Sequence, residues 1–323
     1  MLKASAIALA MLAVAGQLGR WSPWLDVINS VAPLTLAGSL GIFLLVLVRR
    51  RGGVVAIVAA LIGVAGSAER VFPELAAGHE APPQKGFAVT IVTHNVRVDN
   101  RDPLGTAAAL AGSGADVLLL QETDGSVAGA IPRLAARYPY STPCRQARCA
   151  MIILSRWPIK ATRYRIRDSA GRQIGPPLIW ATIAPPGAPP FTVATHHLPW
   201  PLPPRDQSAR RAALIRALPG LDTRTLILAG DFNLTPWSFA MDDLDRGMAP
   251  LRRVTRALPS FPARFGAGGR APPILPIDHV FIGPGWSVTR AERLTATGSD
   301  HFPLRVRLVA NSGQTLRKQD GLD

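Results

Sequence analysis

Leu226-Ile-Leu-Ala-Gly-Asp-Phe-Asn-Leu-Thr-Pro236 joins an apolar run to a short polar motif, Gly230-Asp-Phe-Asn233. The apolar run predicts a buried strand. Side chains alternate along a strand, so Asp231 and Asn233 are expected to project to one side and Phe232 to the other. A carboxylate beside an amide can hold a water molecule and a phosphoryl oxygen. Because Asp and Asn also favour turns, a plain turn after a strand explains this motif equally well when it is taken alone.

Short apolar runs of the same kind recur along the chain from residue 87 onward. The expected strands are residues 87–94, 117–120, 150–154, 178–183, 191–195, 225–228, 279–282 and 304–308, and the expected helices are residues 103–111, 126–137 and 205–218. This mixture indicates an α/β layered domain. Polar residues follow the strands where side chains can converge at one rim of a sheet, and these are Asn95, Glu122, His196, Asp231, Asn233 and His301.

Two histidines and two acids add proton-transfer chemistry to this rim. His279 follows Asp278, and His301 follows Asp300. An imidazole near a phosphate can donate a hydrogen bond or transfer a proton, and a carboxylate commonly orients it. Asp278 and Asp300 are the acids available for that task. The sequence assigns no function to His79 or His94.

A hard cation such as Mg²⁺ prefers one or two carboxylates together with waters and phosphate oxygens. Glu122 and the amide oxygen of Asn95 could supply the protein ligands, although a single Glu after a strand is more often only solvated. Arg97 lies two residues after Asn95. It is either a bidentate ligand for a substrate phosphate or an ordinary surface residue.

Read in order, the motifs resemble those of the endonuclease/exonuclease/phosphatase superfamily, the DNase I-like fold of pancreatic DNase and bacterial sphingomyelinase. The motifs are Thr93-His-Asn95, Leu120-Gln-Glu122, Thr195-His196, Gly230-Asp-Phe-Asn233, Ile277-Asp278-His and Ser299-Asp300-His301. Each motif is weak, but the ordered set is specific. The resemblance implies a four-layer α/β/β/α sandwich over residues 87–310, with the site at one rim.

The resemblance also implies roles for individual residues. Asp231 would position or deprotonate the attacking water, His301 would be a catalytic histidine held by Asp278, and Mg²⁺ or Mn²⁺ would be the cofactor. The metal ligands would be Asn95, Glu122 and Asp300, and the phosphate ligands would be His196 and Asn233.

Two departures affect this transfer. The apurinic-endonuclease branch has a Tyr-x-Pro-Asn motif where this chain has Thr195-His-His-Leu-Pro-Trp200, which disfavours abasic-site repair. The histidine doublet also offers two candidates. We expect His196 to be the functional one, because it follows Thr195 as in the family pattern and because His197 would face the opposite side of a straight strand.

The N-terminal part of the chain has a different composition. Residues 1–68 hold apolar runs at 4–18, 31–48 and 54–68, with few charges apart from Arg49, Arg50 and Arg51. A membrane-spanning helix needs about 20 apolar residues, so the middle run qualifies easily and the outer two are short. We expect a transmembrane segment with three helices, because the second and third runs are apolar on every side. The alternatives are a cleaved signal peptide in the first run, or a buried helical hairpin. Residues 69–86 are expected to be a linker and residues 311–323 a flexible tail.

The charges around these runs predict their orientation. Arg49–Arg51 and Lys3 favour the cytoplasmic side, and Trp21 and Trp24 suit the opposite interface. Three spans then place the catalytic domain on the non-cytoplasmic side of a membrane, which the resemblance to bacterial members makes the inner membrane. A disulfide between Cys144 and Cys149 would fit that oxidising side, whereas free thiols or a zinc site are the alternatives.

The expected activity is metal-dependent hydrolysis of phosphoester bonds, with phosphodiesters favoured. The formal net charge of +15 does not identify the substrate, which could be a nucleic acid, a phospholipid headgroup or a small phosphoester. The membrane is the other expected partner, through the N-terminal helices, and no protein partner is expected. The competing hypothesis is a catalytically inactive, membrane-tethered binding module of the same fold.

Overall fold

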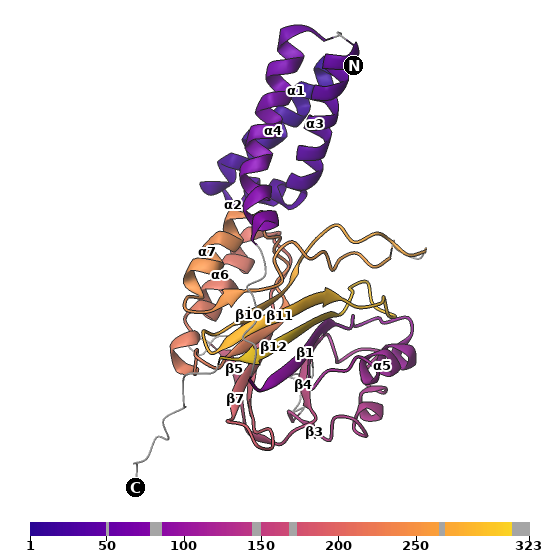
Figure 1. Ribbon diagram of the computed structural model, residues 1–323, viewed down its shortest axis with the longest axis vertical. Coiled ribbons are helices and arrows are strands. Elements are labelled where there is room, and N and C mark those ends of the chain that lie inside the picture. Colours follow the sequence, from indigo (N-terminus) through magenta and orange to yellow (C-terminus); the bar gives the residue numbers. More distant parts are fainter. Residues whose placement is uncertain (50–51, 78–85, 144–149, 168–172, 265–268, 312–323) are drawn as a thin grey trace.

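A computed structural model describes residues 1–49, 52–77, 86–143, 150–167, 173–264 and 269–311. A helical bundle formed by the N-terminal residues stands on a mixed α/β domain (Figure 1). Cys144, Cys149, Arg50, Arg51, His79 and the expected tail from residue 312 lie outside the described residues.

Three long helices and three short ones form the bundle. They are α1 (Leu2–Gln17), η1 (Leu18–Arg20), α2 (Pro23–Asp26), η2 (Val27–Val31), α3 (Ala32–Arg49) and α4 (Gly53–Ala76). Three helical segments, Leu2–Arg20, Pro23–Arg49 and Gly53–Ala76, are long and apolar enough to cross a membrane. Small residues such as Ala6, Ala56 and Ala60 fill the contacts between helices, while many larger apolar side chains face outward. Outward apolar side chains are typical of helices in lipid rather than in water.

The expected start of the linker, at residue 69, was wrong, because helix α4 extends to Ala76. Residues 69–76 continue helix α4, because their side chains have partners in the α/β domain. Val71 packs in a cluster with Leu36 of α3 and Trp237 of the domain. The part of the linker at residues 78–85 lies outside the described residues.

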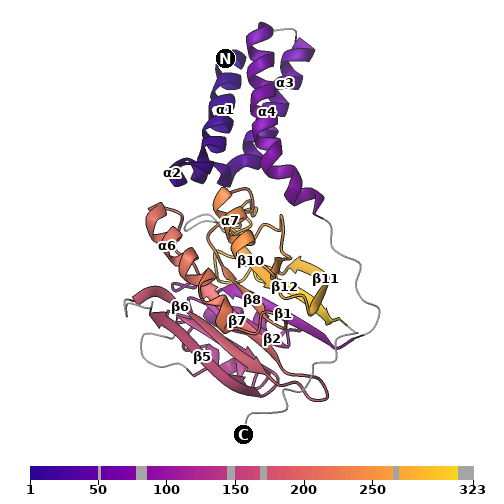
Figure 2. The same cartoon turned by 90° about the vertical axis from the view of Figure 1, so that its left-hand side faces the viewer.

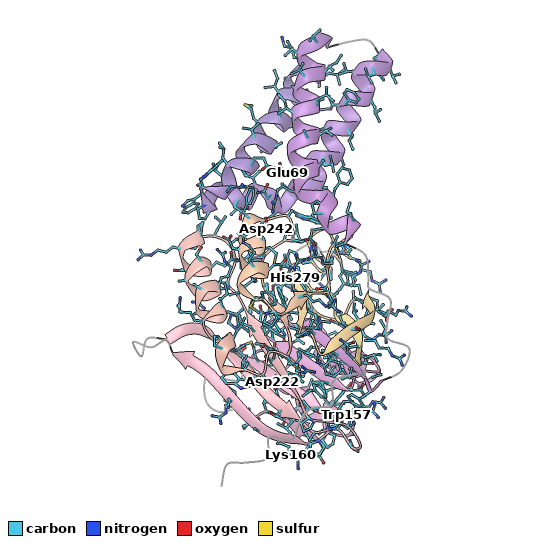
Figure 3. All side chains as sticks on the ribbon, turned by 60° about the vertical axis from the view of Figure 1, so that its left-hand side comes forward. Glu69, Trp157, Lys160, Asp222, Asp242 and His279 are labelled. Carbon is cyan, nitrogen blue, oxygen red and sulfur yellow. The ribbon has the colours of Figure 1, made fainter. Side chains whose placement is uncertain are left out.

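Charged side chains of the bundle bind the α/β domain directly. The Glu74 carboxylate accepts hydrogen bonds from both terminal nitrogens of Arg253, at 3.1 and 2.9 Å. The Nη2 atom of Arg70 lies 2.8 Å from Oδ2 of Asp242. Figure 3 shows Asp242 at this junction, between the bundle and the interior of the domain. These ion pairs tie the end of α4 to the domain.

The α/β domain contains two six-stranded sheets. The first has the order β11-β12-β1-β2-β4-β3, with β1 Ala88–Asn95, β2 Val117–Gln121, β3 Tyr140–Ser141, β4 Met151–Ser155, β11 Trp286–Arg293 and β12 Leu304–Ala310. The second has the order β5-β6-β7-β8-β10-β9, with β5 Ile159–Arg167, β6 Gln173–Ile183, β7 Phe191–His197, β8 Ile227–Asp231, β9 Arg252–Arg253 and β10 Asp278–Ile282. Both sheets are mixed, because β1 is parallel to β2 and β7 is parallel to β8.

Helices cover the outer face of each sheet. Helix α5 (Pro103–Ala111) and η3 (Ile131–Leu134) lie over the first sheet, where Leu110 and Leu134 join one core. Helices α6 (Pro204–Ile215) and α7 (Phe239–Gly247) lie over the second sheet. The short helix η5 (Leu218–Gly220) follows α6 along the chain. In Figure 1, α6 and α7 lie on one side of the strands and α5 lies on the other. The expected four-layer α/β/β/α sandwich is therefore confirmed.

Alternation along the strands decides which residues face the space between the sheets. In β1, Val89 and Ile91 belong to the inter-sheet core, and in β8 the corresponding residues are Ile227 and Ala229. Continuing the alternation brings Asn95 and Asp231 to the same inner face at the strand ends. Because β1, β2, β7 and β8 run in matched parallel pairs, polar residues at their carboxyl ends can meet at one rim.

The secondary structure differs from the expectation in a few places. Residues 126–137 form turns and the short η3 rather than a helix, because Pro132 removes a backbone donor and Gly129 disfavours helix. Helix α7 was missed, although Ser238 supplies a typical N-cap by accepting a hydrogen bond from the Met241 N–H at 3.1 Å. Strands β5 and β11 were also missed. Helix α5 begins and ends where the sequence predicted.

Candidate active site

The polar residues at the strand ends converge around the Asp231 carboxylate, whose side chain is 1% exposed. Its Oδ2 atom accepts hydrogen bonds from the amide nitrogens of Asn95, at 3.0 Å, and Asn233, at 3.3 Å. The Nε2 atoms of His197 and His301 lie 3.5 and 3.6 Å from the same oxygen. Two amides and two imidazoles therefore point at one buried acid.

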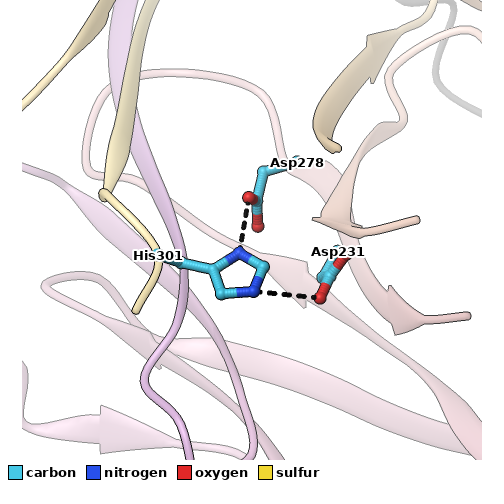
Figure 4. Close-up of side chains that lie close together, drawn as sticks. All are labelled: Asp231, Asp278 and His301. Atoms are coloured by element: carbon cyan, nitrogen blue, oxygen red, sulfur yellow. Dashed lines mark hydrogen bonds and ion pairs between the residues drawn. The ribbon is translucent and has the colours of Figure 1, made fainter. Parts of the chain in front are cut away.

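His301 bridges two carboxylates, as Figure 4 shows. Its Nδ1 atom lies 2.8 Å from Oδ2 of Asp278, while its Nε2 faces Asp231. Burial by itself would lower the pKa of His301, but the charges of Asp278 and Asp231 and the hydrogen bond to Asp278 raise it to about 10. His301 is thus a positively charged proton donor near neutral pH, and the expected Asp278–His301 pair is present.

The pKa values of the two acids that flank His301 are shifted in opposite directions. Burial raises the pKa of Asp231, and the nearby charge of His301 only partly offsets that effect. Burial acts in the same direction on Asp278, but the charge of His301 and the hydrogen bond to it outweigh burial and lower its pKa. Asp278 is therefore the fixed counter-ion of His301, and Asp231 is the stronger base of the two.

His197, rather than His196, belongs to this cluster, so the expectation that His196 faces the site was wrong. In the parallel β7–β8 ladder His197 pairs with Asp231 and His196 pairs with Gly230. Paired residues point to the same face of a sheet, so His197 shares the inner face with Asp231 and His196 takes the outer face. The prediction was wrong because the family's Thr-His pattern does not specify which face of the strand points inward.

Asn95 and Glu122 lie together, as expected, but the amide of Asn95 faces carboxylates. Its nitrogen donates to Oε1 of Glu122 at 2.8 Å as well as to Asp231, and its oxygen accepts from the backbone N–H of Arg97 at 2.9 Å. The other Glu122 oxygen accepts from the backbone N–H of Val98 at 2.9 Å. Asn95 therefore orients two carboxylates in this arrangement.

Arg97 joins the site through Asp300. Its Nη1 atom lies 2.6 Å from Oδ2 of Asp300, and a second ion pair links it to Asp99. These charges, with that of Glu122, contribute to raising the pKa of Arg97, the hydrogen bond to Asp99 being the largest effect. Neither interpretation of Arg97 from the sequence predicted this contact, because Asp300 lies 203 residues away along the chain.

The charges at this rim suit a divalent cation. Glu122, Asp300 and Asp99 gather around Arg97, so three carboxylates share one positive side chain. The side chains of Glu122 and Asp300 are 27% and 22% exposed, which leaves room for water and a phosphate oxygen. This donor set fits the preference of Mg²⁺ or Mn²⁺ for carboxylates plus water.

A second group, Asp231, Asp278 and His301, also has its ligand atoms within 4.8 Å of one another. Its geometry is less suited to a cation, because the Nδ1 atom of His301 and the Oδ2 atom of Asp278 already share a proton at 2.8 Å. The raised pKa of His301 also opposes the neutral form that a metal requires. Glu122 and Asp300 are therefore the better candidates for a metal site.

Backbone strain concentrates at this rim. In the part of the chain that the structure describes, the non-glycine residues with positive φ are Arg97 (63°), Glu122 (58°) and Asn233 (48°). Such conformations are uncommon outside glycine and tend to occur at functional sites. Gly230 is required for a different reason, because an added Cβ would lie 1.9 Å from the carbonyl oxygen of His196.

Two other histidines are buried outside the cluster. Burial lowers the pKa of both His94 and His279 to about 3, so both rings are neutral near pH 7. The Nε2 atom of His279 donates to the carbonyl of Leu234 at 2.8 Å, and the Nε2 atom of His94 is 3.0 Å from the hydroxyl of Thr297. Both rings serve packing and hydrogen bonding at the base of the site.

Ser299 belongs to the Ser299-Asp300-His301 motif, but the sequence assigned it no role of its own. It is fully buried, and its hydroxyl donates to the carbonyl of Asn95 at 2.7 Å and accepts from the His301 N–H at 3.0 Å. Ser299 therefore holds the loop of His301 against the end of β1. Its position before Asp300-His301 is the only sequence signal that could have identified it.

Residues 92–301 match the model of the "Endonuclease/Exonuclease/phosphatase family". A search of curated protein sequences gave no match.

Solved structures share the fold. An endonuclease/exonuclease/phosphatase from Beutenbergia cavernae has a TM-score of 0.56 at 18% identity, covering 69% of this chain and 72% of that one. A family protein from Bacteroides thetaiotaomicron has a TM-score of 0.55 at 17% identity, covering 71% of this chain and 100% of that one. TDP2 from D. rerio, solved with a single-strand DNA product, has a TM-score of 0.55 at 15% identity, covering 68% of this chain and 98% of that one.

Proposed function

Because the chain belongs to the endonuclease/exonuclease/phosphatase family, we propose that it is a membrane-anchored, metal-dependent hydrolase of phosphoester bonds, with phosphodiesters preferred. The observation that supports this most strongly is the set of contacts around Asp231. One buried acid there meets two imidazoles and two amides, beside a partly exposed group of carboxylates.

Asp231 is the residue that accepts the proton of the attacking water. Its raised pKa makes it a stronger base than an exposed aspartate, and the hydrogen bond from Asn95 fixes its orientation. The amide nitrogen of Asn233 donates to the same carboxylate oxygen, and the amide can also bind a phosphoryl oxygen. Together these residues position water and phosphate for in-line attack.

His301 and His197 stabilise the negative charge that develops on the phosphoryl group. Asp278 accepts the Nδ1 proton of His301 and stabilises the positive ring, so Nε2 also carries a proton and can donate it to an oxygen without a prior protonation step. The Nε2 atom of His197 lies 3.5 Å from Asp231 and can donate from the other side. Preorganised donors of this kind commonly provide the largest part of a rate enhancement.

Glu122 and Asp300 would hold Mg²⁺ or Mn²⁺, with Asn95 orienting Glu122. When bound, the cation would neutralise phosphate charge and polarise the scissile bond. Arg97 adjoins the same carboxylates and would share in binding the anionic substrate.

We further propose that the bundle spans a bacterial inner membrane and that the catalytic domain lies on the non-cytoplasmic side. The support is the presence of three helices long and apolar enough to cross a membrane, with Arg49 at the end of the second. A carboxyl-terminal reporter that is active only in the cytoplasm would contradict this orientation.

The candidate substrates remain nucleic acid, phospholipid headgroups and small phosphoesters.

The decisive experiment is a substrate panel with the purified full-length chain, using bis(p-nitrophenyl) phosphate, DNA, phospholipid and inositol phosphates with Mg²⁺ or Mn²⁺. We expect turnover that EDTA abolishes and that added Mg²⁺ or Mn²⁺ restores. The matched variants are Asp231→Ala, which should lose turnover, and Asp222→Ala, an exposed acid that should retain it. Equal rates for wild type and Asp231→Ala would refute the proposed site, and no turnover on any substrate would favour the inactive binding module.

A further inference from the structure

A polar cavity lies at the junction between the bundle and the catalytic domain. Its volume is about 190 Å³, and its walls include Arg20, Asp26, Gln207, Arg211, Phe239 and Asp243. Residues of η1, α2 and η2 line one side of the cavity, and residues of α6 and α7 line the other. In Figure 2, α2 lies next to the ends of α6 and α7. A water molecule needs only about 10–15 Å³ of such space, so the cavity can hold a larger polar group.

The positive charge of Arg211 is incompletely balanced in this cavity. Its side chain is 15% exposed, and its ion pair with Asp243 is long, at 3.8 Å. Asp243 is also shared with Arg246. Burial lowers the pKa of Arg211, with the charges of Asp243 and Asp26 only partly opposing it. A buried guanidinium with so little compensation is stabilised by an added anion.

The carboxylate of Asp26 is held by hydrogen bonds from the protein. Its two carboxylate oxygens accept hydrogen bonds from the backbone N–H groups of Phe239 and Ala240, each at 2.9 Å. The amide nitrogen of Asn29 donates to the same side chain at 2.9 Å. Asp26 therefore caps helix α7, and its charge only partly offsets the burial of Arg211.

Arg20 supplies a second positive charge from the bundle side. Its guanidinium carbon lies 5.2 Å from the ring centroid of Phe239. Within the part of the chain that the structure describes, Arg20 forms no ion pair with a carboxylate. Arg20 and Arg211 thus line the cavity from opposite walls, and arginines bind phosphate oxygens with paired hydrogen bonds.

The cavity lies at the end of the bundle where tryptophans are exposed. Trp21 lines it and is 76% exposed, and Trp24 nearby is 64% exposed. Tryptophan is enriched at the depth of lipid headgroups. If the bundle spans the membrane, the cavity opens at the level where phosphate groups of phospholipids are most concentrated.

We propose that this junction cavity binds the phosphate of an anionic phospholipid headgroup through Arg211 and Arg20. The cavity adjoins the Asp231 cluster, because Asn233 is one of its lining residues and Gln207 in its wall donates to the carbonyl oxygens of Pro199 and Asn233. The inference rests on membrane insertion of the bundle and does not require phosphoesterase activity.

Thermal unfolding of the full-length chain in nanodiscs tests the proposal. We expect Tm in nanodiscs containing equimolar phosphatidylglycerol and phosphatidylcholine to exceed Tm in phosphatidylcholine alone by about 2–4 °C. Arg211→Gln and Arg20→Gln should each remove most of that difference. Arg205→Gln changes the same charge at an exposed position of the same helix and should keep it. Tm in phosphatidylcholine alone reports whether each variant still folds.

A second arm distinguishes a headgroup from free phosphate. Inorganic phosphate added to the protein in detergent should raise Tm in wild type and not in Arg211→Gln, which would support recognition of the phosphate group. Stabilisation by inorganic phosphate with equal Tm in the two nanodiscs would overturn the headgroup assignment. An anionic-lipid effect that persists in both arginine variants would overturn the site.

Discussion

The Nε2 atom of His197 lies 3.5 Å from Oδ2 of Asp231, because the two residues are paired across the parallel strands β7 and β8. His196, the neighbour that the sequence pattern favoured, is paired with Gly230 and points to the other face of the sheet. The imidazole available to a phosphate at this rim is therefore that of His197.

The histidine doublet gives the first prediction. His197→Gln should lower kcat by about 10²–10³-fold, because the transition state loses a preorganised hydrogen-bond donor. His196→Gln is the matched control, since it alters the adjacent residue on the opposite face, and its kcat should change by less than about 10-fold. Steady-state rates on the best substrate from the panel measure both. The reverse ranking would show that the strand register does not identify the functional imidazole.

Asp231 and His301 should behave as one catalytic unit. Each of Asp231→Ala and His301→Ala should lower kcat by about 10²–10⁴-fold, since each removes one side of the 3.6 Å contact between base and proton donor. The double variant should be little worse than the more severe single variant, because residues that act together are strongly non-additive. A double-mutant cycle on kcat measures this coupling. Fully multiplicative losses would mean that the two residues act independently.

Arg97 should weaken the binding of the catalytic cation. Its guanidinium neutralises Asp300, at 2.6 Å, which is one of the two carboxylates assigned to the metal. Arg97→Met should therefore lower the Mg²⁺ concentration for half-maximal activity by about 10-fold, because removing a nearby positive charge favours a second cation. Arg133→Met, at an exposed position, should leave the Mg²⁺ dependence unchanged. A higher Mg²⁺ requirement in Arg97→Met would indicate that Arg97 supports the metal site.

Acidification should destabilise the fold through its buried neutral histidines. Burial lowers the pKa of His279 to about 3 from its usual value near 6.5. Between those values the unfolded chain binds more protons than the folded chain, so the free energy of unfolding falls as pH drops from 6.5 towards 3. The slope is about 1.4 kcal/mol per pH unit for each such histidine, and above pH 6.5 the group adds no dependence.

His279→Gln tests this dependence. The side-chain amide of the glutamine can still donate to the carbonyl of Leu234, but it has no ionisable ring. Unfolding free energies of wild type and variant between pH 5 and 7 provide the measurement. We expect the variant to lose about 1.4 kcal/mol per pH unit of the acid-side slope. Parallel curves for the two proteins would show that His279 is not buried in its neutral form.

Much of the site was within reach of the sequence. The order of the motifs identified the acids at the strand ends, including Glu122, Asp231 and Asp278, and all of these lie at the rim of the sandwich. The pairing of Asp278 with His301 was implied by the resemblance to the family, whereas the residues alone also allowed Asp300. Motifs carry this information because a short polar run after a buried strand places its side chains at a sheet edge whatever the rest of the fold does.

The choice between His196 and His197 depended on tertiary structure. Both sheets of the sandwich are buried on two faces, so neither burial nor hydropathy distinguishes the inward residues of β7 from the outward ones. Only the register with β8 places His197 opposite Asp231. A strand covered on both sides lacks the polar face that would have revealed its orientation in the sequence.

The attachment of the bundle was likewise decided by contacts between distant residues. The apolar runs by themselves predicted three helices, although the outer two runs were short for a span. In the structure all three helical segments are long and apolar enough to cross a membrane. Residues 69–76 looked like a linker, yet they continue α4 because Glu74 pairs with Arg253, 179 residues away. Local sequence determines which segments are apolar and where strands end, whereas long-range ion pairs and strand register determine which polar side chains meet.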